Sequence, residues 1–104
     1  MLATAADAIT ASSAWTTGSL IFITWDEAGS QDSAGCCGAD PGGGHVLTLA
    51  ISHDATGRVT SDIDYNHDSL LASIEAALGL GRLASTCDTG SVSPMTDLMG
   101  SALP

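Results

Sequence analysis

Runs of apolar residues along the chain are of two kinds, and each kind predicts a different secondary structure. Residues 2–14 are rich in alanine and place apolar side chains on one helical face, so we expect a helix there. Residues 19–24 and 46–52 are short, β-branched and apolar throughout, which is typical of strands buried on both faces. Residues 25–44 are rich in Gly, Asp and Ser without apolar periodicity, which predicts a long loop.

The clearest element is a helix predicted over residues 67–78. Its apolar side chains recur at helical spacing and form one stripe that we expect to face the core. The stripe consists of Leu70, Leu71, Ile74, Ala77 and Leu78. Asn66 or Asp68 can cap the start of this helix, and Gly79 stands where a terminating glycine belongs. The tail that follows is predicted to be irregular apart from a helical turn at residues 95–99.

The order helix, strand, loop, strand, loop, helix indicates the α/β class. Two strands buried on both faces need neighbouring strands and covering helices, which this sequence does not supply. We therefore expect the 104 residues to be the C-terminal portion of a larger α/β domain, incomplete on its own. Its exposed sheet edges could then support oligomers.

The charge balance excludes some classes of partner. The chain has 12 acidic residues against only Arg58 and Arg82, and its net charge is −10. Such a chain repels phosphate backbones, so we expect no nucleic-acid binding. No apolar run approaches the roughly 20 residues of a transmembrane helix, and no signal peptide follows Met1.

Three cysteines leave two alternatives open. Adjacent cysteines seldom bond to each other, so a disulfide would join Cys36 or Cys37 to Cys87, as suits an exported protein. The other alternative is three free thiols. Zinc binding is less expected, because no C-x-x-C spacing occurs.

Asp26 and Glu27 are candidate metal ligands because they directly follow the first predicted strand. Sites in α/β sheets lie beyond the carboxyl ends of strands. Neighbouring side chains in a strand point to opposite faces, so both acids reach one ion only if the backbone turns, which Gly29 favours. The alternative is the solvated start of a loop.

Two further candidates lie at the start of an element. Asn66 and His67 begin the clearest helix, where free amides and the helix dipole favour an anion; the alternative is a capping Asn beside an ordinary exposed His. His45 follows three glycines that allow close backbone approach, and His53 is a weaker candidate in a loop.

Taken together, four segments resemble the C-terminal part of the bacterial phosphoesterase family. The segments are IFITWDEAGSQD, GGGHVLTLAIS, YNHDSLLASIEAALGLGRL and PMTDLM, within roughly residues 5–99. That family contains acid phosphatases and phospholipase C-type enzymes and belongs to the alkaline phosphatase-like superfamily. The resemblance implies an α/β/α sandwich around a mostly parallel sheet. It also implies metal-dependent hydrolysis of phosphate esters through a phosphorylated Ser or Thr.

The resemblance also implies roles for individual residues. Asp26 would bind the metal with Glu27 as its carboxylate partner, and these hard oxygen ligands suit Mg, Ca, Mn or Zn. His67 would position or protonate the substrate or its leaving group, beside Asn66 on the substrate side. His45 matches the G-G-G-H form seen in part of the family. A bound cation would offset the acidic charge and attract phosphate.

The sequence departs from the family pattern at several positions, and these departures bear on the branch of the family and on the activity expected of the chain. GCCGADPGGG replaces the D-H-V of phospholipase C-type members, which favours the phosphatase-like branch, and His53 stands where the family usually has Pro. The nucleophile and the N-terminal metal ligands are missing, so we expect the chain alone to be inactive. The full-length parent would be secreted or in the cell envelope, acting on a phosphate-ester small molecule or a phospholipid head group. The alternative is a non-catalytic acidic domain that binds a metal or a partner protein.

Overall fold

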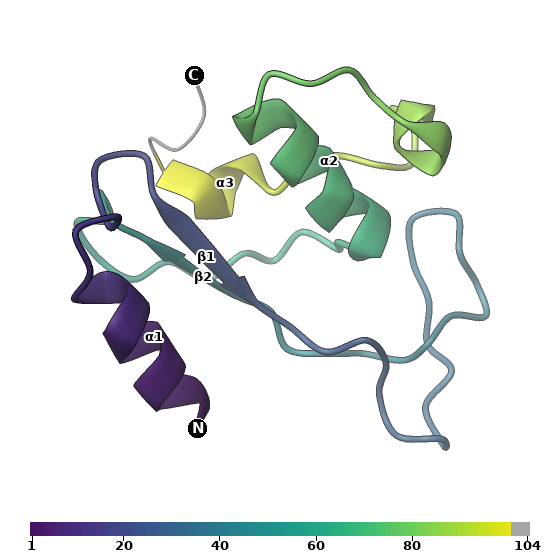
Figure 1. Ribbon diagram of the computed structural model, residues 1–104. Helices are drawn as coiled ribbons and strands as arrows, with labels where there is room; N and C mark the ends of the chain where they lie inside the picture. The colour runs from purple at the N-terminus through teal and green to yellow at the C-terminus, as the bar shows by residue number, and fades with distance from the viewer. Residues whose placement is uncertain (101–104) are drawn as a thin grey trace.

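The computed structural model describes residues 1–100, which form a mixed α/β unit with three α-helices and one two-stranded sheet (Figure 1). The elements, in chain order, are α1 (Leu2–Thr10), β1 (Leu20–Ile23), β2 (Leu49–Ser52), α2 (His67–Ala77), the 3-10 helix η1 (Ala84–Cys87) and α3 (Thr96–Met99). This confirms the mixed α/β class and the predicted order of elements. The turn predicted at residues 95–99 is α3.

The strands β1 and β2 pair antiparallel, with Leu20 opposite Ser52 and Ile23 opposite Leu49. Both are shorter than the predicted strands 19–24 and 46–52, and β2 loses three residues at its start. Figure 1 shows α1 on one side of this pair and α2 with α3 on the other.

The connection between β1 and β2 continues the hairpin without a regular ladder. Thr24 Oγ1 lies 2.8 Å from Thr48 Oγ1, and the Ala28 amide donates to the Gly43 carbonyl at 2.8 Å. The predicted loop 25–44 is therefore irregular, as expected, but its two arms run together as an extension of the strand pair (Figure 1).

The prediction that both strands are buried on both faces is wrong. Every residue of β1 is only partly buried, and Leu49 of β2 is exposed. The physical reason is that only two strands pair within residues 1–100, so each strand keeps an edge without a neighbouring strand.

Helix α1 ends at Thr10, four residues before the predicted end at 14. Thr10 Oγ1 donates to the Asp7 carbonyl at 3.2 Å, and Ser12 Oγ donates to the Ile9 carbonyl at 2.7 Å. Hydroxyl groups that bond to nearby carbonyls compete with the helical ladder and favour its end. None of the α1 residues is buried.

Both predicted caps of α2 are confirmed. The Asn66 side chain accepts a hydrogen bond from the Ser69 amide at 2.9 Å, which satisfies a free donor of the first turn. At the other end, Gly79 has a φ of +65°. Its amide donates to Ala76, and the Leu80 amide donates to the Glu75 carbonyl at 2.8 Å. This pair of bonds is a Schellman motif, in which glycine carries the left-handed turn.

The prediction for the buried face of α2 is wrong. Leu71, Ile74 and Leu78 of the apolar stripe are 39%, 42% and 66% exposed. The buried residues of the helix are instead Ser69, Ala72, Ser73 and Glu75.

Hydrogen bonds explain why a mostly polar face is buried. Thr86 Oγ1 lies 2.8 Å from Glu75 Oε2, the Leu83 amide donates to Glu75 Oε1 at 3.1 Å, and the Met95 amide donates to Ser73 Oγ at 2.8 Å. These bonds attach the tail to α2, because buried polar groups are stable when paired. The buried apolar residues of the described chain are Ala72, Val92, Met95 and Met99.

The cysteine arrangement differs from both alternatives. Cys36 is bonded to its neighbour Cys37, and Cys87 is a free, exposed thiol. The adjacent pair lies in a tight turn, closed by the Ala39 amide donating to the Cys36 carbonyl at 2.9 Å. The proposed bridge from Cys36 or Cys37 to Cys87 is therefore corrected to a bond within the turn.

Candidate functional site

An open groove of about 1510 Å³ lies between the hairpin and the elements that follow it. Its walls are the returning hairpin arm at 42–50, most of the connection 54–65, the start of α2 and the end of α3. Pockets for small molecules usually hold about 300–1,000 Å³, so this groove suits an extended ligand. Four predicted site residues line it: Asp26, His45, Asn66 and His67.

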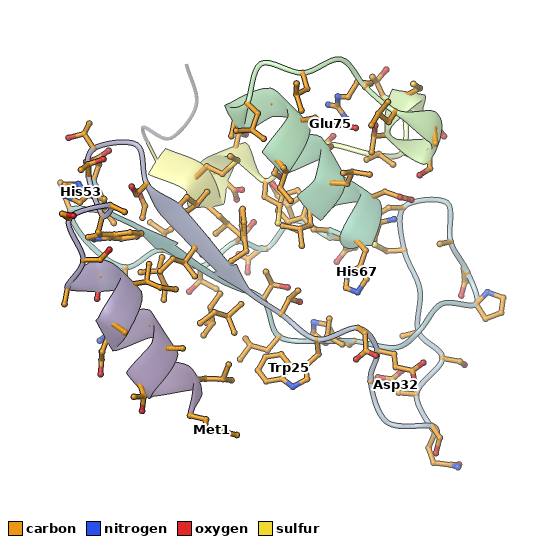
Figure 2. All side chains as sticks on the ribbon, viewed as in Figure 1. Met1, Trp25, Asp32, His53, His67 and Glu75 are labelled. Atoms are coloured by element: carbon orange, nitrogen blue, oxygen red, sulfur yellow. A yellow bond between two sulfur atoms is a disulfide. The ribbon has the colours of Figure 1, made fainter. Side chains whose placement is uncertain are left out.

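The segment that follows β1 meets the start of α2 in this groove. Figure 2 shows His67 pointing from the first turn of α2 toward the segment that follows β1. His67 Nε2 lies 2.9 Å from the Asp26 carbonyl oxygen. Because a carbonyl only accepts, Nε2 carries the proton of this bond, and Nδ1 is the ring atom left for a ligand. The contact joins His67 to the main chain of Asp26 and leaves the carboxylate of Asp26 out of it.

Asn66 caps the start of α2 with its side chain. Its Oδ1 accepts from the Ser69 amide at 2.9 Å, while the Asn66 amide pairs with Ser69 Oγ at 3.4 Å, which completes a capping box. The Nδ2 group is therefore the part of Asn66 that could contact a substrate.

The glycines before His45 shape a turn around Asp32, a residue that the sequence did not single out. The His45 and Ala34 amides each donate to the Asp32 carboxylate at 3.0 Å. Both bonds lower the pKa of Asp32, and the bond from the His45 amide contributes most. Gly44 has a φ of +84°, and a Cβ there would lie 2.6 Å from the Cβ of Ala28. Only glycine fits this turn, which holds the main chain of His45 while its side chain is exposed.

Asp26 and Glu27 offer two exposed carboxylates at the end of β1. Their oxygen atoms suit Mg, Ca or Mn, but these ions usually take about six or more ligands. Among residues 1–100, no group of three or more His, Cys, Asp or Glu side chains comes close enough to hold an ion. Within this part of the chain, Asp26 and Glu27 therefore belong to no group of three such side chains.

A second polar cluster in the groove joins the connection to α3. The Tyr65 hydroxyl donates to Asp97 Oδ1 at 2.7 Å, and Ser61 Oγ donates to Asp97 Oδ2. Burial and the bond to Asp97 raise the pKa of Tyr65 to about 12. The hydrogen bond from the Ser61 hydroxyl contributes most to lowering the pKa of Asp97, and the bond from the Tyr65 hydroxyl lowers it further. No local sequence signal marks Asp97, because its partners lie over thirty positions earlier in the chain.

We expect Tyr65 to titrate at about pH 12 instead of its ordinary 10.0. A pKa that is higher in the folded chain stabilises it fully below pH 10, and this contribution is lost as the pH rises through 12. Tyr65 is the sole tyrosine, so ultraviolet absorbance follows it directly. Asp97→Asn should lower the midpoint, whereas the control Asp62→Asn should not. A midpoint near 10 in the wild-type chain while circular dichroism shows it folded would contradict this cluster.

Comparisons with known proteins assign no family to the chain: no protein-family model, no curated protein and no solved structure matches it. No helix within residues 1–100 is long and apolar enough to cross a membrane.

Proposed function

We propose that this chain supplies part of the active site of a metal-dependent phosphoesterase of the acid phosphatase type. The observation that supports the proposal is the 2.9 Å contact between His67 Nε2 and the Asp26 carbonyl. It joins the strand end T-W-D-E to the helix start Y-N-H, the two segments that carry most of the resemblance. Both line one groove together with His45.

Each of these residues has a defined task in this proposal. The carboxylates of Asp26 and Glu27 offer hard oxygen ligands to a divalent ion, which when bound would polarise the phosphate ester. His67 holds its ring against the Asp26 main chain and presents Nδ1, which can receive or deliver a proton at the leaving group. Asn66 Nδ2 and the exposed ring of His45 can donate to phosphate oxygens.

The proposal assigns the nucleophile and the remaining metal ligands to polypeptide outside this chain. The parent would have the alkaline phosphatase-like α/β/α sandwich and would be secreted or held in the cell envelope. Its substrate would be a phosphate-ester small molecule or a phospholipid head group. The edge of β1 that has no neighbouring strand within residues 1–100 is consistent with a fold that further polypeptide completes.

The proposal predicts that Asp26→Ala abolishes metal-dependent hydrolysis of p-nitrophenyl phosphate by a longer protein that contains this chain. Loss of one carboxylate ligand should lower the rate by about a hundredfold or more, and added metal should restore it partly. The 104-residue chain alone should not hydrolyse this substrate at all. A steady-state assay with and without a chelator measures both.

Asp7→Ala is the matched control, because Asp7 lies on α1 and does not line the groove. This variant should keep full activity. Undiminished, metal-dependent activity in Asp26→Ala would disprove the metal assignment. Chelator-sensitive hydrolysis by the purified chain would disprove the claim that the site needs further polypeptide.

The second candidate is a non-catalytic acidic domain that binds a partner protein. The exposed large apolar side chains favour it, since most of α2's apolar stripe and much of the groove wall are uncovered within residues 1–100. Exposed apolar side chains mark interaction sites where they form a contiguous patch.

A further inference from the structure

The outer edge of β2 has main-chain groups without partners. The His53 amide donates to the Ser19 carbonyl at 3.0 Å, so residues 19 and 53 form a hydrogen-bonded pair. In an antiparallel ladder such pairs alternate with pairs that are not hydrogen-bonded. The pair of Phe22 and Ala50 is therefore of the second kind, and the amide and carbonyl of Ala50 point away from β1. Within residues 1–100 neither group has a hydrogen-bond partner.

This edge lies along the groove and carries no charged or proline side chain. Charged side chains and proline are two of the means by which natural edge strands are blocked. Residues 46–52 read VLTLAIS and contain no charge and no proline. All of them except Ile51 line the groove, so an extended segment can reach the edge.

The side chains of the groove indicate what kind of segment fits. Four aspartates are among the residues that line it, against the single arginine Arg58. The four are Asp26, Asp54, Asp64 and Asp97. The same groove is also lined by exposed apolar residues, namely Leu47, Leu49, Val59 and Ile63. A strand that alternates basic and apolar residues matches both features, because its side chains alternate between two faces.

We propose that the edge of β2 binds an extended peptide segment with basic side chains, which joins the sheet as a third strand. Main-chain bonds give affinity in this mode of recognition, and side chains give specificity. A second copy of the chain fits less well, since each copy has a charge of −10 and would bring a second acidic groove to the contact. The proposal does not depend on phosphoester hydrolysis.

The test is a titration of the 104-residue chain, without metal or phosphate ester, with a peptide of about seven alternating lysine and valine residues. Calorimetry measures affinity, and amide shifts in nuclear magnetic resonance spectra locate the site. Binding should shift the amides of residues 46–52 and weaken as salt is added. A glutamate–valine peptide and a lysine–valine peptide methylated on its central backbone nitrogens should each bind at least about tenfold more weakly.

Ala50→Pro removes the edge amide without breaking the ladder to β1, and proline is tolerated at such edge positions. It should lower peptide affinity about tenfold. The matched control is Leu20→Pro, which removes an outward amide from the opposite edge and does not line the groove. Its affinity should equal that of the wild-type chain.

Several results would overturn the proposal. One is equal binding of the methylated and unmethylated peptides, which would show attraction by charge alone. Equal binding of the lysine and glutamate peptides is another, and so is unchanged affinity in a folded Ala50→Pro chain. If Ala50→Pro fails to fold, the methylated peptide still decides. Sedimentation showing a dimer paired through residues 46–52 that the peptide does not displace would assign the edge to a second copy.

Discussion

Replacing Thr86 by valine should destabilise the folded chain by about 2 kcal/mol, because it removes a hydrogen-bond partner from a buried polar group. Glu75 and Thr86 are 1% and 0% exposed, so water cannot take the place of the lost bond. Thr86 Oγ1 lies 3.1 Å and 2.8 Å from the two carboxylate oxygens of Glu75. Valine keeps the volume of threonine and removes the donor, which leaves the carboxylate with only the Leu83 amide at 3.1 Å.

Urea unfolding followed by circular dichroism measures this loss. Thr89→Val is the control, because Thr89 is exposed and should change stability by less than about 0.5 kcal/mol. The double variant Glu75→Met/Thr86→Val should lose less stability than the two single variants lose together. The reason is that it buries no unpaired carboxylate. Additive losses, or a Thr86→Val chain as stable as the control, would refute the role given to this pair.

The elements of this chain could be predicted because local signals determine them. The β-branched run before Trp25 forms a strand, and Asn66 and Gly79 bound α2 as their residue types require. The C-terminal end of α1 was predicted four residues too late, because the hydroxyls of Thr10 and Ser12 compete for helical carbonyls, an effect that periodicity does not include.

Burial could not be predicted in the same way. Periodicity shows that α2 has an apolar stripe, but the face that packs depends on what the rest of the chain offers. Residues 83–95 offer hydroxyl and amide donors, so the face with Ser73 and Glu75 is buried and Leu78 stays exposed. The tail lacks the apolar periodicity that would have covered the stripe.

In the candidate site, too, local motifs could be predicted from the sequence and contacts between distant residues could not. Motif resemblance singled out Asp26 and His67, and the structure brings His67 to the main chain of Asp26. Asp32 and Asp97 were missed, because a single Asp in a polar loop looks the same whether or not distant groups bond to it. The glycine at position 44 was a usable signal for the turn around Asp32, since a Cβ there would collide with Ala28.

Met99→Ala should destabilise the chain by about 3 kcal/mol, because Met99 is fully buried and its loss leaves a cavity. The buried apolar core of residues 1–100 is small: only Ala72, Val92 and Met95 share it with Met99. Small domains bury a modest fraction of their surface and are marginally stable. A loss of about 3 kcal/mol is therefore a large fraction of the stability expected of such a chain.

A thermal melt and urea unfolding of the same sample measure the effect of Met99→Ala. The matched control is Leu78→Ala, which removes an apolar side chain of similar size that is 66% exposed and should shift stability by about 0.5 kcal/mol or less. If both variants lose the same amount, the described core does not hold the chain together. If Leu78→Ala alone is strongly destabilised, the apolar stripe of α2 is covered in solution, and a partner or second copy must be sought there.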